Sequence, residues 1–250
     1  MEDYQVQWNQ SFQSALEDDA ANSIPPEALV REVSYFLRRR HKPSEYGQLR
    51  ALDAGCGVGP MTRWFAKKGI FVSGVDVSDV ALRQCDFLNK KELLREEYLR
   101  IGLTRGSLVT LPLENDFFDV VVEANVVQHL SKYDRQSAFN EIFRVLKPGG
   151  VFIAQQQGWH STARQLGDEL GCEVEGDRFT YVFPDIQGKT SYHLTDFPTH
   201  FFTRGEYLEV LPAFSQKDIH ELSYEIPVEE ARNRGCEVYR NKFYLLYCIK

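Results

Sequence analysis

The sequence lacks the long apolar runs that cross membranes. No stretch of its 250 residues approaches the ~20 consecutive apolar residues that a bilayer-spanning helix needs. Its first residues, Met-Glu-Asp-Tyr-Gln, also lack the basic and apolar parts of a secretory signal. We therefore expect no membrane partner and a cytoplasmic location.

Cysteine is scarce, and no two cysteines have the spacing of a functional pair. The five cysteines form no C-x-x-C motif, and an odd number is typical of reduced thiols in the cytoplasm. The histidines are also irregularly spaced, and no pair has the spacing of metal ligands. We expect no metal cofactor.

Positive charge is in deficit. Lys and Arg number 29 against 36 Asp and Glu, which gives a net charge of −7. The one basic cluster, Arg38 to Lys42, follows an apolar helical pattern and is typical of a helix C-terminus, where cations interact favourably with the helix dipole. This balance argues against a large phosphate-binding surface, so we expect no nucleic-acid partner.

A glycine-rich turn follows a short apolar run near the start of the chain. Residues 52–60 read Leu-Asp-Ala-Gly-Cys-Gly-Val-Gly-Pro, and a helical pattern comes next. A strand that turns on glycines into a helix leaves unpaired backbone N–H groups and lets a ligand approach the main chain. The next apolar run ends at Asp76, whose carboxylate can accept hydrogen bonds from both hydroxyls of a ribose. These features predict a nucleoside-cofactor site.

The spacing within the turn distinguishes between cofactors. Dinucleotide-binding folds favour G-x-G-x-x-G, whereas the order here is Asp53-x-Gly55-x-Gly57-x-Gly59. A carboxylate at Asp53 repels a pyrophosphate but attracts a cofactor that carries an ammonium group. S-adenosylmethionine carries such a group and has no phosphate.

The chain resembles the class I S-adenosylmethionine-dependent methyltransferases. The resemblance rests on the glycine turn and on motifs that recur in that family in this order: Leu-Pro-Leu at 111–113, Phe-Asp-Val-Val at 118–121, Gln-His-Leu at 128–130 and Leu-Lys-Pro-Gly-Gly at 146–150. It covers residues 50–157 specifically and the remainder loosely. The N-P-P-Y and D-P-P-Y motifs that position a base amine in nucleic-acid methyltransferases are absent.

The resemblance implies a three-layer α/β/α Rossmann-like sandwich. We expect a mostly parallel, seven-stranded sheet with an antiparallel last strand and a small inserted cap. Residues 1–250 then form a single domain, in which residues 1–45 form part of a lid and residues 158–202 form the cap. The residue pattern predicts strands near 49–52, 70–75, 99–103, 118–123, 151–154, 179–183, 219–226 and 237–249, a turn near 232–235, and helices over 4–18, 79–97 and 133–146.

The resemblance also implies roles for individual residues. Asp53 and the glycines surround the methionine part of the cofactor, Asp76 binds the ribose, and Ser107 lies where the family meets the adenine. Many relatives have an aspartate at the Ser107 position, so this chain departs from the pattern there. The cofactor-binding residues implied are Tyr4, Trp8, Asp53, Gly55, Cys56, Gly57, Gly59, Asp76, Val77, Ser107, Leu108, Glu123, Ala124 and Asn125.

Two residues near the end of the fourth strand each have two interpretations. Glu123 either faces the transferable methyl group, together with Ala124 and Asn125, or caps the following turn. His129 is the best placed general base for an acceptor that must lose a proton, but it equally fits a histidine that packs at the start of a helix. Histidines of the expected cap are further candidates for the base: His160, His193 and His200.

Aromatic residues outside the motifs also have two interpretations. Tyr4 and Trp8 either shield the cofactor's sulfonium through cation–π contacts or simply pack in the core. The aromatic residues of the cap either form the wall of an apolar acceptor pocket or cover the sheet: Trp159, Phe179, Tyr181, Phe183 and Tyr192.

Taken together, the residues predict a methyltransferase that acts on a small molecule, with S-adenosylmethionine as donor and S-adenosylhomocysteine as product. Methyl transfer is an in-line displacement, so positioning supplies much of the catalysis. A protein or peptide acceptor and a non-catalytic cofactor-binding module remain alternatives. A nicotinamide-dependent oxidoreductase is disfavoured by Asp53 and by the glycine spacing.

Overall fold

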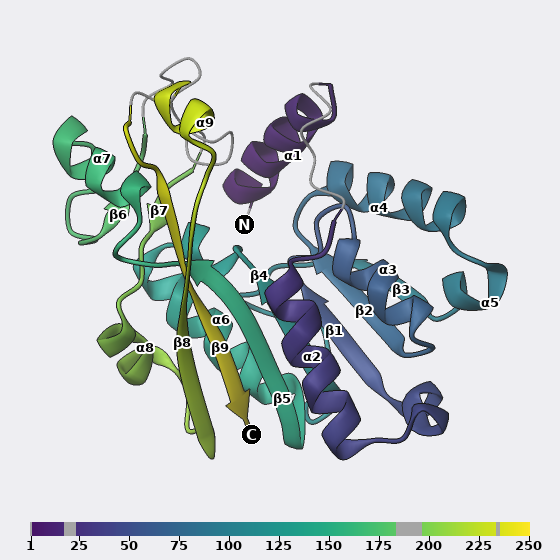
Figure 1. Ribbon diagram of the computed structural model, residues 1–250. Coiled ribbons are helices and arrows are strands. Elements are labelled where there is room, and N and C mark those ends of the chain that lie inside the picture. The colour runs from purple at the N-terminus through teal and green to yellow at the C-terminus, as the bar shows by residue number, and fades with distance from the viewer. Residues whose placement is uncertain (1, 18–23, 184–196, 234–235) are drawn as a thin grey trace.

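A seven-stranded sheet forms the centre of the protein (Figure 1). The computed structural model describes residues 2–17, 24–183, 197–233 and 236–250. The strand order is β3-β2-β1-β4-β5-β9-β8. The strands are β1 (Arg50–Ala54), β2 (Phe71–Asp76), β3 (Ile101–Arg105), β4 (Phe118–Ala124), β5 (Leu146–Gln157), β8 (Gln216–Glu225) and β9 (Arg240–Ile249).

Strand directions confirm the expected α/β sandwich. Every pair among β1 to β5 is parallel, and β9 runs antiparallel to both β5 and β8. Because the parallel strands are buried on both faces, they are nearly continuous apolar runs. Their carboxyl ends meet at one edge of the sheet, which is where ligands bind in open parallel sheets.

Helices cover both faces of the sheet. On one face α2 (Glu27–Arg40) and α3 (Pro60–Lys67) bury Leu29, Val33 and Phe65 against β1, β4 and β5. On the other face α6 (Lys132–Val145) and α8 (Arg204–Val210) bury Phe139 and Tyr207. The helices α4 (Asp79–Glu92) and α5 (Arg95–Tyr98) lie beside β2 and β3. Among the described residues, no helix is long and apolar enough to cross a membrane.

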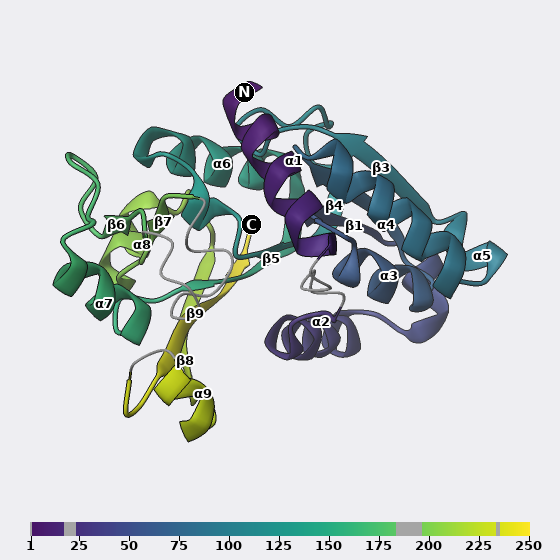
Figure 2. The same cartoon turned by 90° about the horizontal axis from the view of Figure 1, so that it is seen from above.

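The helix α1 (Glu2–Glu17) lies across the carboxyl ends of the strands (Figure 2). It is fixed there by Asn9, whose Oδ1 accepts hydrogen bonds from Ser78 Oγ at 2.8 Å and from the Val80 N–H at 3.3 Å. Gln5 also donates to Asp79 at 2.8 Å. The N-terminal helix is therefore attached to the start of α4, next to the end of β2.

The expected cap is a small side unit on the β8–β9 side of the sheet (Figure 1). Its described elements are α7 (Thr162–Leu170), β6 (Thr180–Tyr181) and β7 (Thr199–His200), with α9 (Val228–Asn233) beside them. Two short 3-10 helices, η1 (Pro43–Gln48) and η2 (Val127–His129), complete the fold. Tyr192 and His193 of the expected cap lie outside the described residues.

Several predicted boundaries are wrong. The helix predicted over 79–97 is two helices, because the backbone at Leu93 is extended. The strand predicted over 179–183 is reduced to Thr180–Tyr181. The turn predicted near 232–235 is preceded by α9, which reaches Asn233, and residues 234–235 are not described. The strand β5 begins at Leu146, directly after α6, so it includes the Lys-Pro-Gly-Gly segment.

Candidate active site

The glycine turn connects β1 to α3 in a conformation that side chains would obstruct. Gly55 has φ 75°, and a Cβ there would lie 2.3 Å from a methyl carbon of Val126. Gly59 precedes α3 with φ 82°, and a Cβ there would lie 2.3 Å from the Cys85 sulfur. Both the backbone angle and the close neighbours therefore require glycine at these two positions.

Asp53 is a buried carboxylate at the end of β1. Its Oδ2 accepts a hydrogen bond from Thr62 Oγ1 at 2.7 Å. Burial raises the pKa of Asp53 to about 6, against the effect of the Thr62 hydrogen bonds, and the nearby Asp76 raises it further. A cation in the cavity would favour the charged form of this carboxylate.

Asp76 occupies the equivalent place at the end of β2. Its two oxygens accept the backbone N–H of Gly57 at 2.8 Å and that of Ser78 at 2.9 Å. Burial raises the pKa of Asp76, and the backbone N–H groups partly oppose this rise. The carboxylate thus joins the glycine turn to the start of α4, and its remaining lone pairs are available to ligand hydroxyls.

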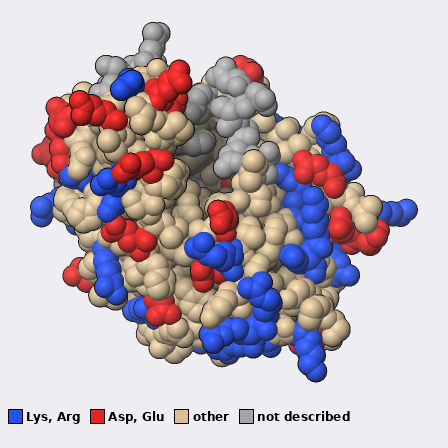
Figure 3. Space-filling view, in the orientation of Figure 1, with Lys and Arg blue, Asp and Glu red and all other residues tan. Residues whose placement is uncertain are grey.

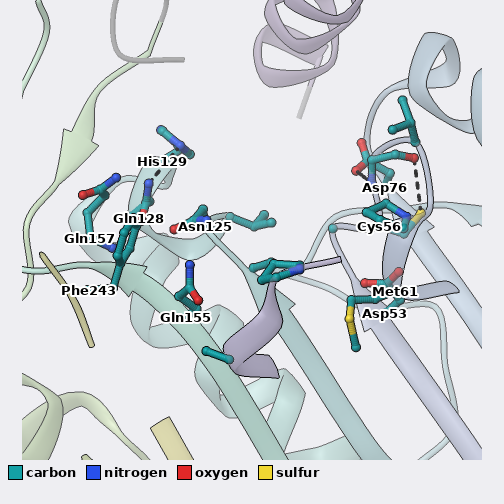
Figure 4. A pocket seen from close by; sticks show the side chains of 18 of the residues that line it. Asp53, Cys56, Met61, Asp76, Asn125, Gln128, His129, Gln155, Gln157 and Phe243 are labelled. Carbon is teal, nitrogen blue, oxygen red and sulfur yellow. Dashed lines mark hydrogen bonds between the residues drawn. The ribbon is translucent and has the colours of Figure 1, made fainter. Parts of the chain in front are cut away.

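A cavity of about 900 Å³ lies over the carboxyl ends of the strands. Figure 3 shows the surface hollowed near the top of the view, and Figure 4 shows Asp53 and Asp76 on one side of the pocket and Asn125, His129 and Gln157 on the other. The predicted residues that line it are Tyr4, Trp8, Asp53, Gly55, Cys56, Gly57, Asp76, Val77, Ser107, Leu108, Ala124, Asn125 and His129. Gly59 and Glu123 are not among its lining residues.

Glu123 lies on the opposite face of the sheet from Asp53. In the register of β1 and β4, Asp53 is opposite Val122 and Glu123 is opposite Ala54, and successive side chains of a strand point to opposite faces. Glu123 is fully buried and accepts hydrogen bonds from the N–H groups of Val126 and Val127 and from Gln156. Burial raises its pKa to about 7. Of the two roles considered for Glu123, the structure supports capping of the turn after β4.

Cys56 and Ser107 line the cavity with small side chains. Contact with Cys85 and burial raise the pKa of the Cys56 thiol well above its usual value, which suits packing rather than nucleophilic attack. Ser107 Oγ accepts a hydrogen bond from the Val109 N–H at 3.2 Å. At position 107 this chain therefore offers a hydroxyl that shapes its own turn.

The helix α1 contributes an aromatic side to the cavity. The Trp8 ring stacks on Phe197 with centroids 4.0 Å apart and an interplanar angle of 13°. The Tyr4 hydroxyl accepts a hydrogen bond from the Ser131 N–H at 3.2 Å. Both rings therefore contact residues far along the chain while they line the cavity.

His129 also lines the cavity, but both of its ring nitrogens have neighbours in the protein. Nδ1 lies 3.3 Å from the Pro198 carbonyl and 3.3 Å from Thr199 Oγ1. Nε2 lies 3.3 Å from Gln128 Nε2, and the ring is edge-on to Trp8 with centroids 5.4 Å apart. This arrangement holds the imidazole within a wall of the cavity.

The described cap aromatics do not line the cavity, so of the two interpretations considered for them the structure does not support the cavity wall. Tyr181, Phe183 and Phe201 instead form a separate apolar cluster, and Trp159 packs against Phe179. His160 is exposed, and His200 is buried against Thr180 and Glu206. Tyr192 and His193 lie outside the described residues.

Residues of β5 and β9 form a part of the cavity that sequence reasoning missed. Gln155 and Gln157 of β5 and Asn241 and Phe243 of β9 are lining residues. The signal was present in the run Gln155-Gln156-Gln157, which follows the apolar residues 151–154 and places two amides on one face of the strand.

Comparisons with known proteins agree with this geometry. Residues 52–154 match the family model described as "Methyltransferase domain". A probable S-adenosylmethionine-dependent methyltransferase of Mycolicibacterium smegmatis is 35% identical over 145 residues, which are 56% of this chain and 51% of that protein. A sterol 24-C-methyltransferase of Gibberella zeae is 27% identical over 168 residues, which are 67% of this chain and 41% of that protein.

Two solved structures share the fold. A methyltransferase from Methanosarcina mazei has a TM-score of 0.61 and 21% identity over 80% of this chain and 92% of that chain. A 1,6-didemethyltoxoflavin-N1-methyltransferase from Burkholderia thailandensis has a TM-score of 0.61 and 16% identity over 100% of this chain and 90% of that chain. That structure contains 1,6-didemethyltoxoflavin and S-adenosylhomocysteine.

Fold and site together define a nucleoside-cofactor-binding α/β protein. Residues 52–154 carry a methyltransferase domain, and the comparisons support a class I S-adenosylmethionine-dependent methyltransferase. The chain spans 51% and 41% of the length of the two curated relatives described above.

Proposed function

We propose that the protein transfers a methyl group from S-adenosylmethionine to a small molecule. One observation carries the proposal: Asp53 and Asp76 lie at one side of a cavity of about 900 Å³ that continues over β5 and β9, so a cofactor and an acceptor have room side by side. We also propose that residues 1–250 act as one methyltransferase domain, that residues 1–45 contribute to its lid, and that the protein is cytoplasmic.

The residues present fit the cofactor. Asp53 suits the ammonium of the methionine part, Asp76 suits the ribose hydroxyls, and Ser107 and Leu108 suit the adenine. Val126 lies close to Gly55, and Phe12 lies close to Gly57, where an added Cβ would be 3.3 Å from the Phe12 ring. At both glycines the main chain, and no side chain of the turn, therefore faces the cavity. This donor set contains carboxylates where a pyrophosphate-containing cofactor would need cations or bare N–H groups.

The chemistry that the bound cofactor supplies is an electrophilic methyl group on a sulfonium. The chain's own residues then have to bind and orient the two reactants and exclude water from the cavity. This suffices when the reaction is an in-line displacement. Tyr4 and Trp8 on α1 close one side of the cavity. A general base is needed only for an acceptor that loses a proton, and His129 stays our prediction for that role.

The names of relatives support a small acceptor. The sterol 24-C-methyltransferase and the 1,6-didemethyltoxoflavin-N1-methyltransferase are both named for small molecules.

The two alternatives, a peptide acceptor and a non-catalytic binding module, are separated by one experiment. Protein incubated with methyl-labelled S-adenosylmethionine and a small-molecule extract should form a labelled product below the size of a peptide. Label recovered only in protein favours the peptide acceptor, and cofactor binding without any transfer favours the binding module.

A further inference from the structure

The side of the cavity opposite the two carboxylates is lined by carboxamides. Gln155 and Gln157 come from β5, Asn125 and Gln128 from the segment after β4, and Asn241 from β9. Figure 4 shows Asn125, Gln128, Gln155 and Gln157 grouped together with Phe243 and apart from Asp53 and Asp76. We refer to Asn125, Gln128, Gln155, Gln157 and Asn241 as the amide cluster.

Strand register explains why these side chains share one face. Gln157 pairs with Phe243 across β5 and β9, and Phe243 pairs with Leu222 across β9 and β8. Paired residues on neighbouring strands point to the same face, as do residues two apart along one strand. Asn125 joins them because its N–H donates to the Gln155 carbonyl at 2.8 Å, with φ 58°, a backbone angle that asparagine tolerates.

Two oxygens of the amide cluster have no partner in the described part of the chain. They are Asn125 Oδ1 and Gln157 Oε1, and both are buried. Leaving a buried acceptor unsatisfied costs about 1–3 kcal/mol, so native proteins rarely do so without a reason. Gln128 differs, because its Oε1 accepts the Gln157 N–H at 2.8 Å and its amide is thereby oriented.

The strands around these oxygens contribute uncharged and aromatic side chains to the cavity, and the two charged lining residues of α2, Glu27 and Arg31, form an ion pair with each other. Among the described lining residues from β5, β8 and β9, none is Asp, Glu, Lys or Arg. Phe243 and Tyr224 stack with centroids 6.0 Å apart and an interplanar angle of 20°, and both line the cavity. A flat ring surface beside vacant hydrogen-bond acceptors suits a planar ligand that donates hydrogen bonds and carries no net charge.

We propose that the amide cluster binds the methyl acceptor, and that this acceptor is a neutral, planar molecule with N–H or O–H donors. Asn125 Oδ1 and Gln157 Oε1 accept its hydrogen bonds, and Phe243 packs against its plane. The inference rests on the proposed function, because it assigns the acceptor side of the same cavity. It distinguishes this chain from an enzyme for a purely apolar acceptor, which would leave both oxygens unsatisfied.

Calorimetry with a matched pair of probes tests the proposal. The protein is first saturated with S-adenosylhomocysteine and then titrated with lumazine, a neutral planar ring system with N–H donors, or with 1,3-dimethyllumazine, which has the same rings without those donors. We expect lumazine to bind at least about tenfold more tightly, as expected for lost hydrogen bonds to buried acceptors.

Variants then locate the interaction. Gln157→Leu should weaken lumazine binding by about tenfold or more, and Asn125→Gly, which keeps the backbone angle, should do the same. Gln165→Leu on the exposed side of α7 is the matched control and should bind as the wild type does. Affinity for S-adenosylhomocysteine should be unchanged in Gln157→Leu and Gln165→Leu, which also verifies that these two variants fold.

Three results would overturn the assignment: no lumazine binding, equal affinity for the two probes, or a loss of S-adenosylhomocysteine affinity in Gln157→Leu. The last result would mean that the amide oxygens serve the cofactor. If the wild type fails to bind S-adenosylhomocysteine at all, the proposed function itself fails, and the two failures are distinguishable.

Discussion

At the scale of single residues, the three buried carboxyl groups at the ends of β1, β2 and β4 have different roles because their surroundings differ. Asp53 and Asp76 are held at strand ends on the cavity face, and burial raises the pKa of both. Glu123 is one residue before Ala124, which lines the cavity, and it is buried on the other face, where burial raises its pKa to about 7. The first two are suited to ligand binding, and Glu123 to holding a turn.

Asp53→Asn should weaken binding of S-adenosylhomocysteine and make it less dependent on pH. Burial raises the pKa of Asp53 to about 6, so in the wild type the charged form that attracts an ammonium is lost as the pH falls through that value. Near pH 8 the loss of the charge should cost about 1.5–3 kcal/mol of binding. Calorimetry at several pH values measures both effects. Asp116→Asn, the same change at an exposed acid, is the control, and equal pH profiles for wild type and Asp53→Asn would contradict the role of Asp53.

Glu123→Gln should alter the pH dependence of stability. The pKa of Glu123 rises from 4.5 to about 7 on folding, so its folded form holds a proton that the unfolded chain has lost between those values. Its contribution to stability is therefore complete below 4.5 and falls as the pH rises through about 7. The wild type should lose about 3 kcal/mol of unfolding free energy over this range through this residue.

The neutral glutamine does not titrate, so Glu123→Gln should keep its free energy of unfolding over this range. The stability of the variant relative to the wild type should therefore increase as the pH rises. Denaturant unfolding measures the difference. Glu141 provides a contrast of opposite sign, because its hydrogen bond with Arg144 lowers its pKa. As the pH rises, the free energy of unfolding of Glu141→Gln should decrease relative to that of the wild type. Parallel pH profiles for the wild type and Glu123→Gln would refute the assignment of Glu123 as a buried, proton-holding group.

At the scale of elements, the site depends on how a strand, a turn and a helix meet. The glycine turn needs both a left-handed backbone and close neighbours, and hydrogen bonds to Asn9 help to attach α1 to the start of α4. The turn is encoded locally, whereas the position of α1 depends on contacts between residues about 70 positions apart.

Gly59→Ala should destabilise the protein more than Gly69→Ala. The two glycines have nearly equal angles, φ 82° and 81°, so the backbone strain of an alanine is matched, at about 1–2 kcal/mol. A Cβ at Gly69 meets no atom within 4 Å, whereas one at Gly59 meets the Cys85 sulfur at 2.3 Å. Overpacking adds about 1–3 kcal/mol. Denaturant unfolding compares the two variants, and equal losses would show that the contact with Cys85 does not constrain the turn.

Asn9→Ala should loosen α1 and weaken cofactor binding. The substitution removes the acceptor of hydrogen bonds from Ser78 Oγ and the Val80 N–H, at about 0.5–1.5 kcal/mol each. Hydrogen exchange of the α1 amides should quicken, and affinity for S-adenosylhomocysteine should fall because Tyr4 and Trp8 line the cavity. Gln13→Ala, at an exposed position of the same helix, should change neither. Unchanged exchange in Asn9→Ala would rule out this attachment of α1.

At the scale of the whole molecule, the sequence predicts the elements and motif positions that short local patterns encode. It does not predict contacts that depend on which strands pair and in which register. The order of strands and helices and the places of Asp53 and Asp76 follow from short patterns that end at strand termini. The sequence could not decide the role of Glu123, because one residue of register decides which face a side chain takes. The sequence could not decide between the two interpretations of the cap aromatics either, because their neighbours are set by contacts such as that of Tyr181 with Phe201.

The amide cluster was missed for a related reason. Gln155 and Gln157 are adjacent in space to Asn241 and Phe243 only because β9 inserts between β5 and β8. No periodicity within β5 reveals that neighbour. The run of three glutamines indicates polar side chains at the end of this strand, but it does not reveal which residues of other strands lie beside them.

The central claim, that this cavity holds the adenosyl cofactor on Asp76 and the glycine turn, is tested most directly by calorimetric titration with S-adenosylhomocysteine beside NAD. The wild type should bind S-adenosylhomocysteine in the micromolar range and show no preference for NAD. Asp76→Ala should weaken this binding by about 1.5–3 kcal/mol, while Asp86→Ala, an acid of α4 that does not line the cavity, should not. Absence of S-adenosylhomocysteine binding, or tighter binding of NAD, would contradict the account.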